Sequence, residues 1–550
     1  MKSNILISSF LLLINLTSYA NITIIHNVKG NTINQNKHTT FSAIAIESGK
    51  VLNIGNLEEL SKSHPDARFI DGKGKSMLPG LHDAHAHIMG YSRLQSEVNL
   101  AGDTSLEQSL KKVKDYADSN PDKQWILGRG WNQVLWEGKK FPNKSDLDSL
   151  NINKPIFLRR VDGHAGWANS IAMEITGTIG YEKDIPGGEI LLDQNGLQTG
   201  IFVDNAMGLI SNKIEEEDAF DTIDFMINGL KKLASIGLTS VDDAGISYQT
   251  YNAYKLLAKH KLMPIRINAM AHSSDGNIQK MLEKPINTED DFLQVHSIKY
   301  VFDGALGSRG ALMIEPYSDR ADTKGLLVQT QDFVQKMIYA NAKNGWQAAI
   351  HAIGDNANRM ALNALSDKRA LSKSNRNRVE HAQIINMEDI SIFSKQHIIA
   401  SMQPTHATSD KNMAEDRVGK ERLKGAYAWN TLSEDGVMIA SGSDFPVELA
   451  NPFFGIHAAV TRQDRDNQPL SGWIPSERLT LEQTLASFTI NAAFTNRKDD
   501  KLGSLEPGKW ADFILVDQNI FTIDKKDIWK TQVLQTWVAG KKIFDRALEK

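Results

Sequence analysis

Cysteine is absent from this chain of 550 residues. Its absence excludes disulfide bonds, thiolate metal sites and cysteine nucleophiles, so a bound metal would have to be held by histidine, aspartate, glutamate or a modified lysine. An excess of one charge is also missing, because 62 lysines and arginines nearly balance 66 aspartates and glutamates, which leaves a net charge of −4. Without a basic surface to neutralise phosphates, we expect no nucleic-acid partner.

Long apolar runs are missing after the N-terminal segment, which excludes a protein with several membrane spans. The N-terminal segment itself has the pattern of a signal peptide. Lys2 supplies a positive charge, an apolar run covers Ile5–Leu16, and Ser18 and Ala20 place small residues at the positions that a signal peptidase recognises. We expect residues 1–20 to be removed and the mature protein to be periplasmic or secreted, without a stable membrane anchor. The alternative is an uncleaved anchor helix.

Short β segments lie at both ends of the remaining chain. Asn21–Val28 alternates between apolar and polar residues, and a hairpin is expected around Ser48-Gly49; near the C-terminus, similar segments flank a turn at Ala539-Gly540. Because the two ends of a chain often lie close together, residues 21–75 and 500–550 are expected to form one composite β-sandwich domain.

The middle of the chain, residues 76–499, alternates short apolar segments with amphipathic stretches. Eight segments are expected to be strands: Ser76–Leu81, Leu238–Val241, Ile265–Ala269, Ile298–Phe302, Gln347–Ile350, Asn377–Glu380, Ile398–Met402 and Val437–Ala440. Alternating strands and helices form a parallel sheet, and eight units predict an α/β fold with a closed (β/α)8 TIM barrel. The interval from about residue 89 to about residue 219 is too long for one crossover and predicts an inserted subdomain.

The strongest chemical signal is a His-x-His pair near the start of the predicted barrel. Because residues i and i+2 of a strand point to the same side, His85 and His87 are expected to converge on one metal just beyond the first barrel strand. Such a pair alone is weak, but polar residues also occur at or near the ends of later predicted strands: Lys299, His351, His381 and Asp444. The carboxyl ends of barrel strands form the active site of this fold, so together these residues predict a metal site there.

Zinc is the metal that this set of residues favours. Neutral imidazoles suit Zn²⁺, and carboxylates complete its coordination shell. Lys299 cannot bind a metal as an ammonium group, but desolvation in the barrel mouth would lower its pKa, and carbamylation by CO₂ would give an N6-carboxylated side chain able to bridge two metals. The alternative role of Lys299 is a salt bridge to a barrel acid. The alternative role of Asp444 is a helix N-cap, because it lies just before Phe445-Pro446.

Taken together, these motifs resemble the amidohydrolase superfamily, and most closely its YtcJ-like, amidohydrolase family 3 branch. The matching segments are Pro79–His87, Gly237–Asp243, Lys299 with Phe302–Arg309, His351–Asp355, Glu380–Gln383, Gly442–Pro446 and Gly503–Asp512. The resemblance covers nearly all of the mature chain. It implies a metal-dependent hydrolase with a (β/α)8 barrel and a β-sandwich built from both termini.

The resemblance also implies roles for single residues. His85 and His87 would bind one metal, and His351 and His381 would bind a second. Carbamylated Lys299 would bridge the two ions, although a single metal without carbamylation is an alternative. Asp444 would be a metal ligand and would also accept the proton of the attacking water.

These roles predict an exported amidohydrolase that cleaves the C–N bond of a small N-acyl or N-substituted amide. Asp444 acts in this prediction as general base and then general acid, and Trp131, His164 and Arg309 are the predicted substrate contacts. A lactonase or phosphoesterase on the same metal site is the first alternative, since function depends on the pocket and not on the fold. A non-catalytic metal-binding protein is the second. The sequence leaves open whether the chain forms a homodimer.

Overall fold

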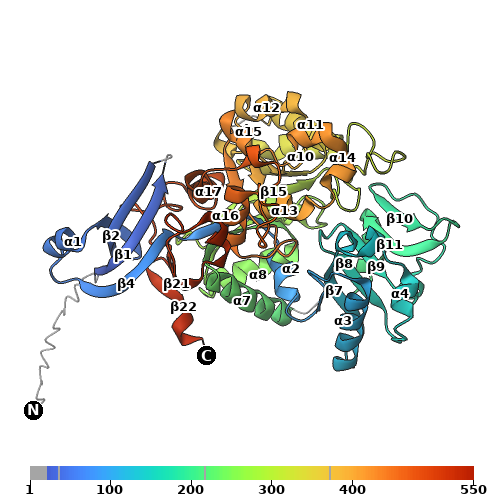
Figure 1. The fold of residues 1–550 in the computed structure, drawn as a ribbon, viewed down its shortest axis with the longest axis horizontal. Helices are drawn as coiled ribbons and strands as arrows, with labels where there is room; N and C mark the ends of the chain where they lie inside the picture. Colours follow the sequence, from blue (N-terminus) through green and yellow to red (C-terminus); the bar gives the residue numbers. More distant parts are fainter. Residues whose placement is uncertain (1–21, 35–36, 216–218, 371–372, 550) are drawn as a thin grey trace, which may run out of the picture.

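The computed structural model describes residues 22–34, 37–215, 219–370 and 373–549. The predicted signal peptide, residues 1–20, lies outside these ranges. Within them, no helix combines the length and the apolar character needed to cross a membrane. Three β-sheets organise the described chain, and the central one lies between the other two (Figure 1).

The first sheet joins the two ends of the chain. Its seven strands, in spatial order, are β22 (Lys541–Asp545), β21 (Val533–Val538), β20 (Phe513–Val516), β4 (Arg68–Pro79), β1 (Thr23–Asn34), β2 (Lys37–Glu47) and β3 (Lys50–Gly55), with α1 (Leu57–Ser63) beside them. The C-terminal strand β20 pairs antiparallel with the N-terminal strand β4, so that blue and red strands lie side by side in Figure 1. The Val51 N–H also donates to Lys509 O at 2.8 Å, which folds the β3 edge toward the C-terminal segment.

The central sheet is a parallel barrel of eight strands. They are β5 (Leu81–Ala86), β12 (Leu238–Ile246), β13 (Arg266–His272), β15 (Leu293–Val301), β16 (Gln347–Ala352), β17 (Arg378–His381), β18 (Ile399–Met402) and β19 (Ile439–Ser441), and the short β14 (Ile286–Asn287) pairs beside β15. The loop after β19 closes the barrel, because the Asp444 N–H donates to His85 O and the His87 N–H donates to Phe445 O, each at 2.7 Å. The predicted TIM barrel is therefore confirmed.

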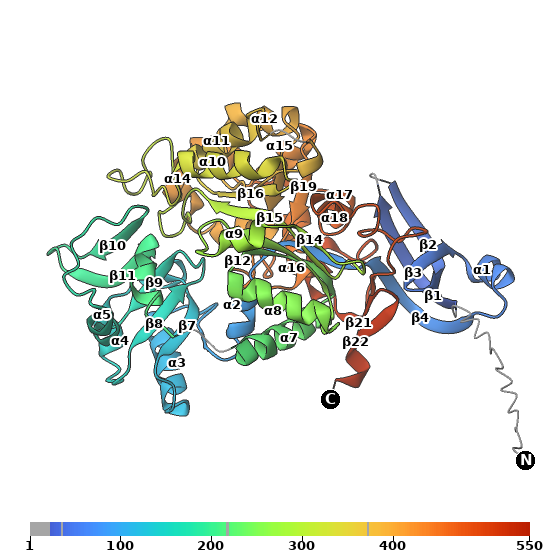
Figure 2. The same cartoon turned by 180° about the vertical axis from the view of Figure 1, so that it is seen from behind.

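Helices surround the barrel, and α7 and α8 lie along one side of it in Figure 2. They are α7 (Ala219–Ser235), α8 (Tyr248–Lys259), α9 (Ile278–Leu282), α10 (Gln331–Ala342), α11 (Asp355–Ser366), α12 (Ile390–Lys395), α13 (Pro404–Asp410), α14 (Ala414–Arg422), α15 (Trp429–Glu434), α16 (Pro452–Thr461), α17 (Leu481–Ser487) and α18 (Ile490–Thr495). Helix α10 shows why such segments form: Thr330 caps its N-terminus, and Val334, Ile338 and Ala342 recur every fourth residue on its buried face.

The third sheet lies between β5 and α7 in the sequence and on the opposite side of the barrel from the terminal sheet (Figure 1). Its strands are β10 (Gly188–Leu192), β11 (Gln198–Asp204), β9 (Ala165–Ala168), β8 (Ile156–Arg160), β7 (Ile126–Trp131) and β6 (Val98–Asn99), accompanied by α3 (Leu106–Ser119), α4 (Lys144–Asp148), α5 (Ser170–Thr176) and α6 (Gly208–Ser211). Helix α2 (Ile88–Arg93), which directly follows β5, packs against α7 of the barrel. A separate apolar cluster that includes Trp131 and Trp167 fills the core of the third sheet. Below, this unit is called the inserted sheet.

One predicted strand was wrong. Ser76–Leu81 was expected to be the first barrel strand, but β4 ends at Pro79 in the terminal sheet, and the barrel begins at Leu81 with β5. Gly80 separates them, and a Cβ there would lie 2.2 Å from Thr239 Oγ1, so only glycine fits this junction. The His-x-His pair consequently begins inside the first barrel strand.

Candidate metal centre

The His-x-His pair lies at the carboxyl end of β5. His85 is in the strand and is fully buried, whereas the His87 side chain, at the N-cap position of α2, is 38% exposed. The two rings are 5.6 Å apart between centroids. Both Nε2 atoms face one carboxylate oxygen, Asp444 Oδ1, which is 3.7 Å from His85 Nε2 and 3.1 Å from His87 Nε2. Three donors of the kind that Zn²⁺ prefers therefore meet here.

Asp444 is held in place by the loop that closes the barrel. Its backbone has a positive φ of 60°, and the preceding Ser443 N–H and Oγ–H both donate to Asp83 of β5. Burial raises the pKa of the Asp444 carboxyl, but the surrounding histidines, His87 first, outweigh burial and hold the pKa well below its usual range. The helix that follows, α16, is capped by Asn451, so Asp444 is not a helix N-cap.

His351 and His381 lie side by side on the neighbouring strands β16 and β17. Their ring centroids are 4.5 Å apart, and the His381 ring is 4.7 Å from that of His85. His381 Nδ1 lies 2.8 Å from Gln403 Oε1, so a proton on Nδ1 donates to Gln403 and leaves Nε2 free to bind a metal. His351 Nε2 lies 3.5 Å from Asp303, a buried carboxylate whose pKa burial raises to about 7.

Lys299 is buried in the interior of the barrel on β15. Its Nζ lies 3.0 Å from His85 Nε2, within the group of histidines. Burial lowers the pKa of this amine to about 8, well below the ordinary lysine value of 10.5. Burial therefore favours the neutral amine more than it does for an exposed lysine, and only the neutral amine can react with CO₂.

His406 is a further member of the site that sequence reasoning left undecided. It lies in the first turn of α13, just after β18, and its Nε2 is 3.6 Å from Asp444 Oδ2. Among the described residues, two groups have ligand atoms within 4.8 Å of one another: His85, His87 and Asp444, and His381, His406 and Asp444. Asp444 is shared by both groups.

Two buried atoms support the presence of a cation. His351 Nε2 and His406 Nε2 are both buried and have no hydrogen-bond partner in the described part of the chain. A buried polar atom without a partner is unfavourable by about 1–3 kcal/mol, so such atoms call for a ligand. Imidazole nitrogens and carboxylate oxygens together suit a divalent transition metal, and the residues present fit such an ion.

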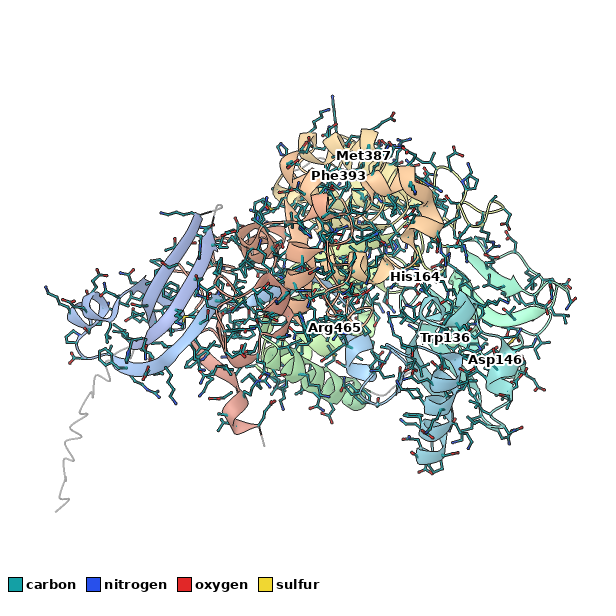
Figure 3. The ribbon with its side chains drawn as sticks, viewed as in Figure 1. Trp136, Asp146, His164, Met387, Phe393 and Arg465 are labelled. Atoms are coloured by element: carbon teal, nitrogen blue, oxygen red, sulfur yellow. The ribbon has the colours of Figure 1, made fainter. Side chains whose placement is uncertain are left out.

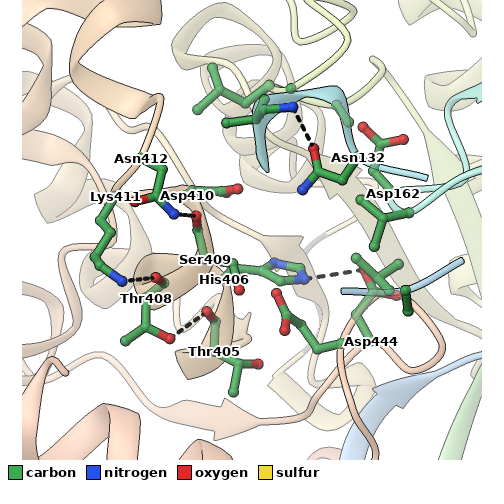
Figure 4. A pocket seen from close by; sticks show the side chains of 18 of the residues that line it. Asn132, Asp162, Thr405, His406, Thr408, Ser409, Asp410, Lys411, Asn412 and Asp444 are labelled. Atoms are coloured by element: carbon green, nitrogen blue, oxygen red, sulfur yellow. Dashed lines mark hydrogen bonds and ion pairs between the residues drawn. The ribbon is translucent and has the colours of Figure 1, made fainter. Parts of the chain in front are cut away.

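A cavity of ≈ 520 Å³ adjoins these ligands. His351, His381, His406 and Asp444 form its inner wall, and residues of the inserted sheet complete the opposite wall: Asn132, Arg160, Asp162 and His164. Figure 4 shows His406 facing Asp444, with Asn132 and Asp162 on one side of the cavity and Asp410 on the other. The inserted sheet thus contributes directly to the pocket.

Of the three predicted substrate contacts, the structure places only His164 at the cavity. It lies where the inserted sheet meets the barrel (Figure 3), with its ring 5.2 Å from that of His351. Its Nδ1 is 2.6 Å from Asp204 Oδ1. Burial lowers the pKa of His164, but the Asp204 carboxylate outweighs burial, and the net pKa is raised.

Trp131 and Arg309 lie elsewhere. Trp131 ends β7 with no exposed surface, and its indole N–H donates to Leu158 O at 2.8 Å within the core of the inserted sheet. Arg309 donates to both oxygens of Asp319, at 3.2 and 2.9 Å, which occupies its guanidinium. Neither residue lines the cavity.

Comparisons with known proteins agree with this geometry. Residues 68–544 match the model of the amidohydrolase family. The chain is 33% identical over 522 residues to Protein LONG AFTER FAR-RED 3 of Arabidopsis thaliana (91% of this chain, 88% of that protein) and 30% identical over 512 residues to the putative amidohydrolase YtcJ of Bacillus subtilis (92% and 96%). It is 25% identical over 538 residues to an N-substituted formamide deformylase of Arthrobacter pascens (93% and 96%).

A solved structure shows the same fold. An uncharacterized metal-dependent hydrolase from Pyrococcus horikoshii superposes with a TM-score of 0.75 at 24% identity, over 92% of this chain and 99% of that one. The family match covers the barrel, the inserted sheet and the part of the terminal sheet that begins at β4, whereas β1, β2 and β3 precede it. This chain belongs to the amidohydrolase family and is a hydrolase.

Proposed function

We propose that this hydrolase cleaves the C–N bond of a small N-acyl or N-substituted amide. The observation that carries the proposal is the convergence of four histidines on Asp444: His85, His87, His381 and His406. Asp444, His381 and His406 also line the cavity. A divalent cation held by these residues would lower the pKa of a bound water toward neutrality and would polarise a substrate carbonyl. The name of the relative from Arthrobacter pascens, a deformylase of N-substituted formamides, supports an amide as the substrate.

Asp444 is the group proposed to move the proton. It lines the cavity, and the histidines around it keep it ionised, so that it can accept a proton from water. The same carboxyl can then give that proton to the nitrogen of the leaving amine. His164 faces the substrate from the opposite wall, and Asp204 holds its ring through Nδ1, so that the His164 Nε2 edge is directed away from Asp204.

Zinc is the proposed metal, with one or two ions bound. Lys299 is proposed to bridge two ions after N6-carboxylation, because its buried amine lies against His85 and its pKa is lowered. Metal analysis of the purified protein, together with its intact mass in the presence and absence of added bicarbonate, tests this part. Less than half an equivalent of metal in active protein would contradict the mechanism itself.

Export to the periplasm or secretion is proposed from the sequence pattern alone. N-terminal sequencing of the protein recovered from a fractionated expression host tests it, and a mature N-terminus at Asn21 is the expected result. A protein that keeps Met1 and stays with the cell pellet would contradict it.

A substrate panel separates the amide proposal from its alternatives. N-substituted formamides, N-acyl amines, dipeptides, lactones and phosphoesters are offered at equal concentration, and release of amine is expected to be fastest from the amides. Turnover of lactones or phosphoesters with inert amides would favour the alternative chemistry on the same site. The His164→Gln variant of the hydrolase is expected to raise KM more than it lowers kcat if His164 contacts substrate.

A further inference from the structure

A continuous series of buried charged side chains crosses the interior of the barrel behind the metal centre. It connects β5, β12 and β17, and its members in order of contact are His85, Glu380, Arg378, Asp242 and His82. Every member is at most 4% exposed. Below, this series is called the buried charge ladder. Among its members, His85 alone belongs to the proposed ligand set.

At the near end, Glu380 contacts Nδ1 of His85, whereas Nε2 of the same ring faces Lys299 and Asp444. Glu380 Oε2 lies 2.5 Å from His85 Nδ1. Arg378 donates to both oxygens of Glu380, from Nη2 to Oε2 at 3.0 Å and from Nε to Oε1. Because arginine offers only donors, the Glu380 carboxylate must accept from it, so the proton shared with His85 belongs to His85 Nδ1.

This hydrogen bond determines which tautomer His85 adopts. With the proton on Nδ1, Nε2 keeps its lone pair, and that lone pair points toward Lys299 and Asp444. The bond also fixes the orientation of the ring, because rotation about Cβ–Cγ would put a carbon in the place of Nδ1 and break the contact with Glu380. The Glu380 carboxylate thus determines which nitrogen of His85 is free to bind a metal and in which direction that nitrogen points.

At the far end, the ladder compensates the charge of Arg378. Arg378 Nη1 donates to Asp242 Oδ2 at 2.8 Å. Asp242 Oδ1 accepts from Asn496 Nδ2 at 2.6 Å and lies 2.7 Å from His82 Nε2. Asp242 therefore keeps three partners, and the loss of His82 would still leave it paired with Arg378 and Asn496.

We propose that Glu380, supported by Arg378, is a positioning residue that holds His85 as a metal ligand with a free Nε2, whereas His82 serves only the packing of the barrel. This inference rests on the proposed function, since it needs His85 to be a ligand. A purely structural ladder makes a different prediction: both ends would affect unfolding, and neither would affect the affinity for metal.

The test is a zinc titration of metal-free protein against a chromophoric chelator. Glu380→Gln keeps the shape of the side chain and removes its charge, and the Kd for Zn²⁺ is expected to rise about 10- to 100-fold. His82→Asn is the matched control at the other end of the ladder, and its Kd is expected to stay within about threefold of the original value. Absorption spectra of the Co²⁺-loaded proteins are expected to shift for Glu380→Gln and to stay unchanged for His82→Asn.

Each outcome has one meaning. An unchanged Kd and Co²⁺ spectrum for folded Glu380→Gln overturns the inference, and so does an equal loss of affinity in His82→Asn. If Glu380→Gln does not fold, Glu380→Asp replaces it, because the shorter acid keeps its charge beside Arg378 but withdraws from His85 and should also weaken zinc binding. If the unaltered protein binds no Zn²⁺, the proposed function fails first, and the positioning role fails with it.

Discussion

Among the described residues, some buried polar atoms lack hydrogen-bond partners at the mouth of the barrel, where the strands end, and buried charged side chains form ion pairs at its base, where the strands begin. At the mouth, His351 Nε2 and His406 Nε2 are buried and lack hydrogen-bond partners within the described residues. At the base, Arg266 donates to both oxygens of Asp512, at 2.6 and 3.1 Å, and Lys498 lies 2.5 Å from Asp291. The ion pairs at the base join the barrel to neighbouring segments. At the mouth, by contrast, imidazole nitrogens stay available as metal ligands. Stability is therefore concentrated at one end of the strands and chemistry at the other.

The largest expected effect comes from the mouth residue shared by both ligand groups. Asp444→Asn removes the proton acceptor, and kcat is expected to fall about 10²- to 10⁴-fold. Its thermal unfolding midpoint should fall little, because the substitution at the mouth leaves the ion pairs at the base of the barrel intact. Steady-state kinetics and thermal unfolding of the same preparation measure both quantities. If kcat and the unfolding midpoint both fell strongly, Asp444 would contribute to stability as well as to catalysis, and the division between mouth and base would be wrong.

A second comparison ranks the ligands within the mouth. His85 is held by Glu380 and Lys299, whereas His406 Nε2 is 3.6 Å from Asp444 and has no hydrogen-bond partner in the described chain. Loss of a hydrogen bond that supports a ligand weakens metal binding about 10- to 100-fold, and His85→Asn, which removes the ligand itself, is expected to weaken zinc binding more than that. His406→Asn is expected to lose less affinity. Chelator titration of both variants checks the order, and a greater loss in His406→Asn would reverse it.

Sequence reasoning recovered what depends on periodicity and missed what depends on side-chain direction. The barrel followed from eight alternating units, and the His-x-His pair followed from the two-residue period of a strand. The boundary at Gly80 was missed because two strands in different sheets follow each other directly there, so their apolar patterns merge. A periodic pattern does not mark a change of sheet.

The substrate contacts show the same limit. Trp131 and His164 both lie near strand ends of the inserted sheet, yet the Trp131 indole turns inward and His164 faces the cavity. His406 follows Gln403-Pro404 at the start of α13, and only the fold decides that this turn points at Asp444. Arg309 lies outside the cavity lining and pairs with Asp319, a contact between side chains that the sequence pattern does not mark.

The third prediction concerns the base. Arg266→Met deletes the charged partner of the buried Asp512 carboxylate and leaves it with the Ala539 N–H as hydrogen-bond donor. The free energy of unfolding is expected to fall by about 3–5 kcal/mol. The Kd for Zn²⁺ and kcat per folded molecule are expected to stay unchanged, because Arg266 begins β13 at the end away from the ligands. Urea unfolding and active-site titration measure these quantities. A changed Kd would mean that the base positions the mouth.

The smallest expected effect is a pH dependence at the base. Burial raises the pKa of Asp291, but Lys498, the Trp510 indole N–H and Lys501 outweigh burial and hold the pKa below the ordinary value of 3.8. A lowered folded-state pKa contributes stability above the unfolded value and loses it as the pH falls through the folded one. Asp291→Asn is therefore expected to reduce the free energy of unfolding by about 1.5–3 kcal/mol at neutral pH.

This difference between the original protein and Asp291→Asn should shrink as the pH falls below 3.8, because the carboxyl then takes up a proton in the unfolded state first and in the folded state at a lower pH. Urea unfolding of metal-free protein across that range measures it. Asp118→Asn is the matched control, because Asp118 pairs with Lys114 on the exposed face of α3 and should change stability by less than about 1 kcal/mol. A difference for Asp291→Asn that persists undiminished in acid would assign the stabilisation to neutral hydrogen bonds. The base would then be stabilised by neutral hydrogen bonds and not by ion pairs. The difference between the base and the mouth would then consist only in the metal ligands at the mouth.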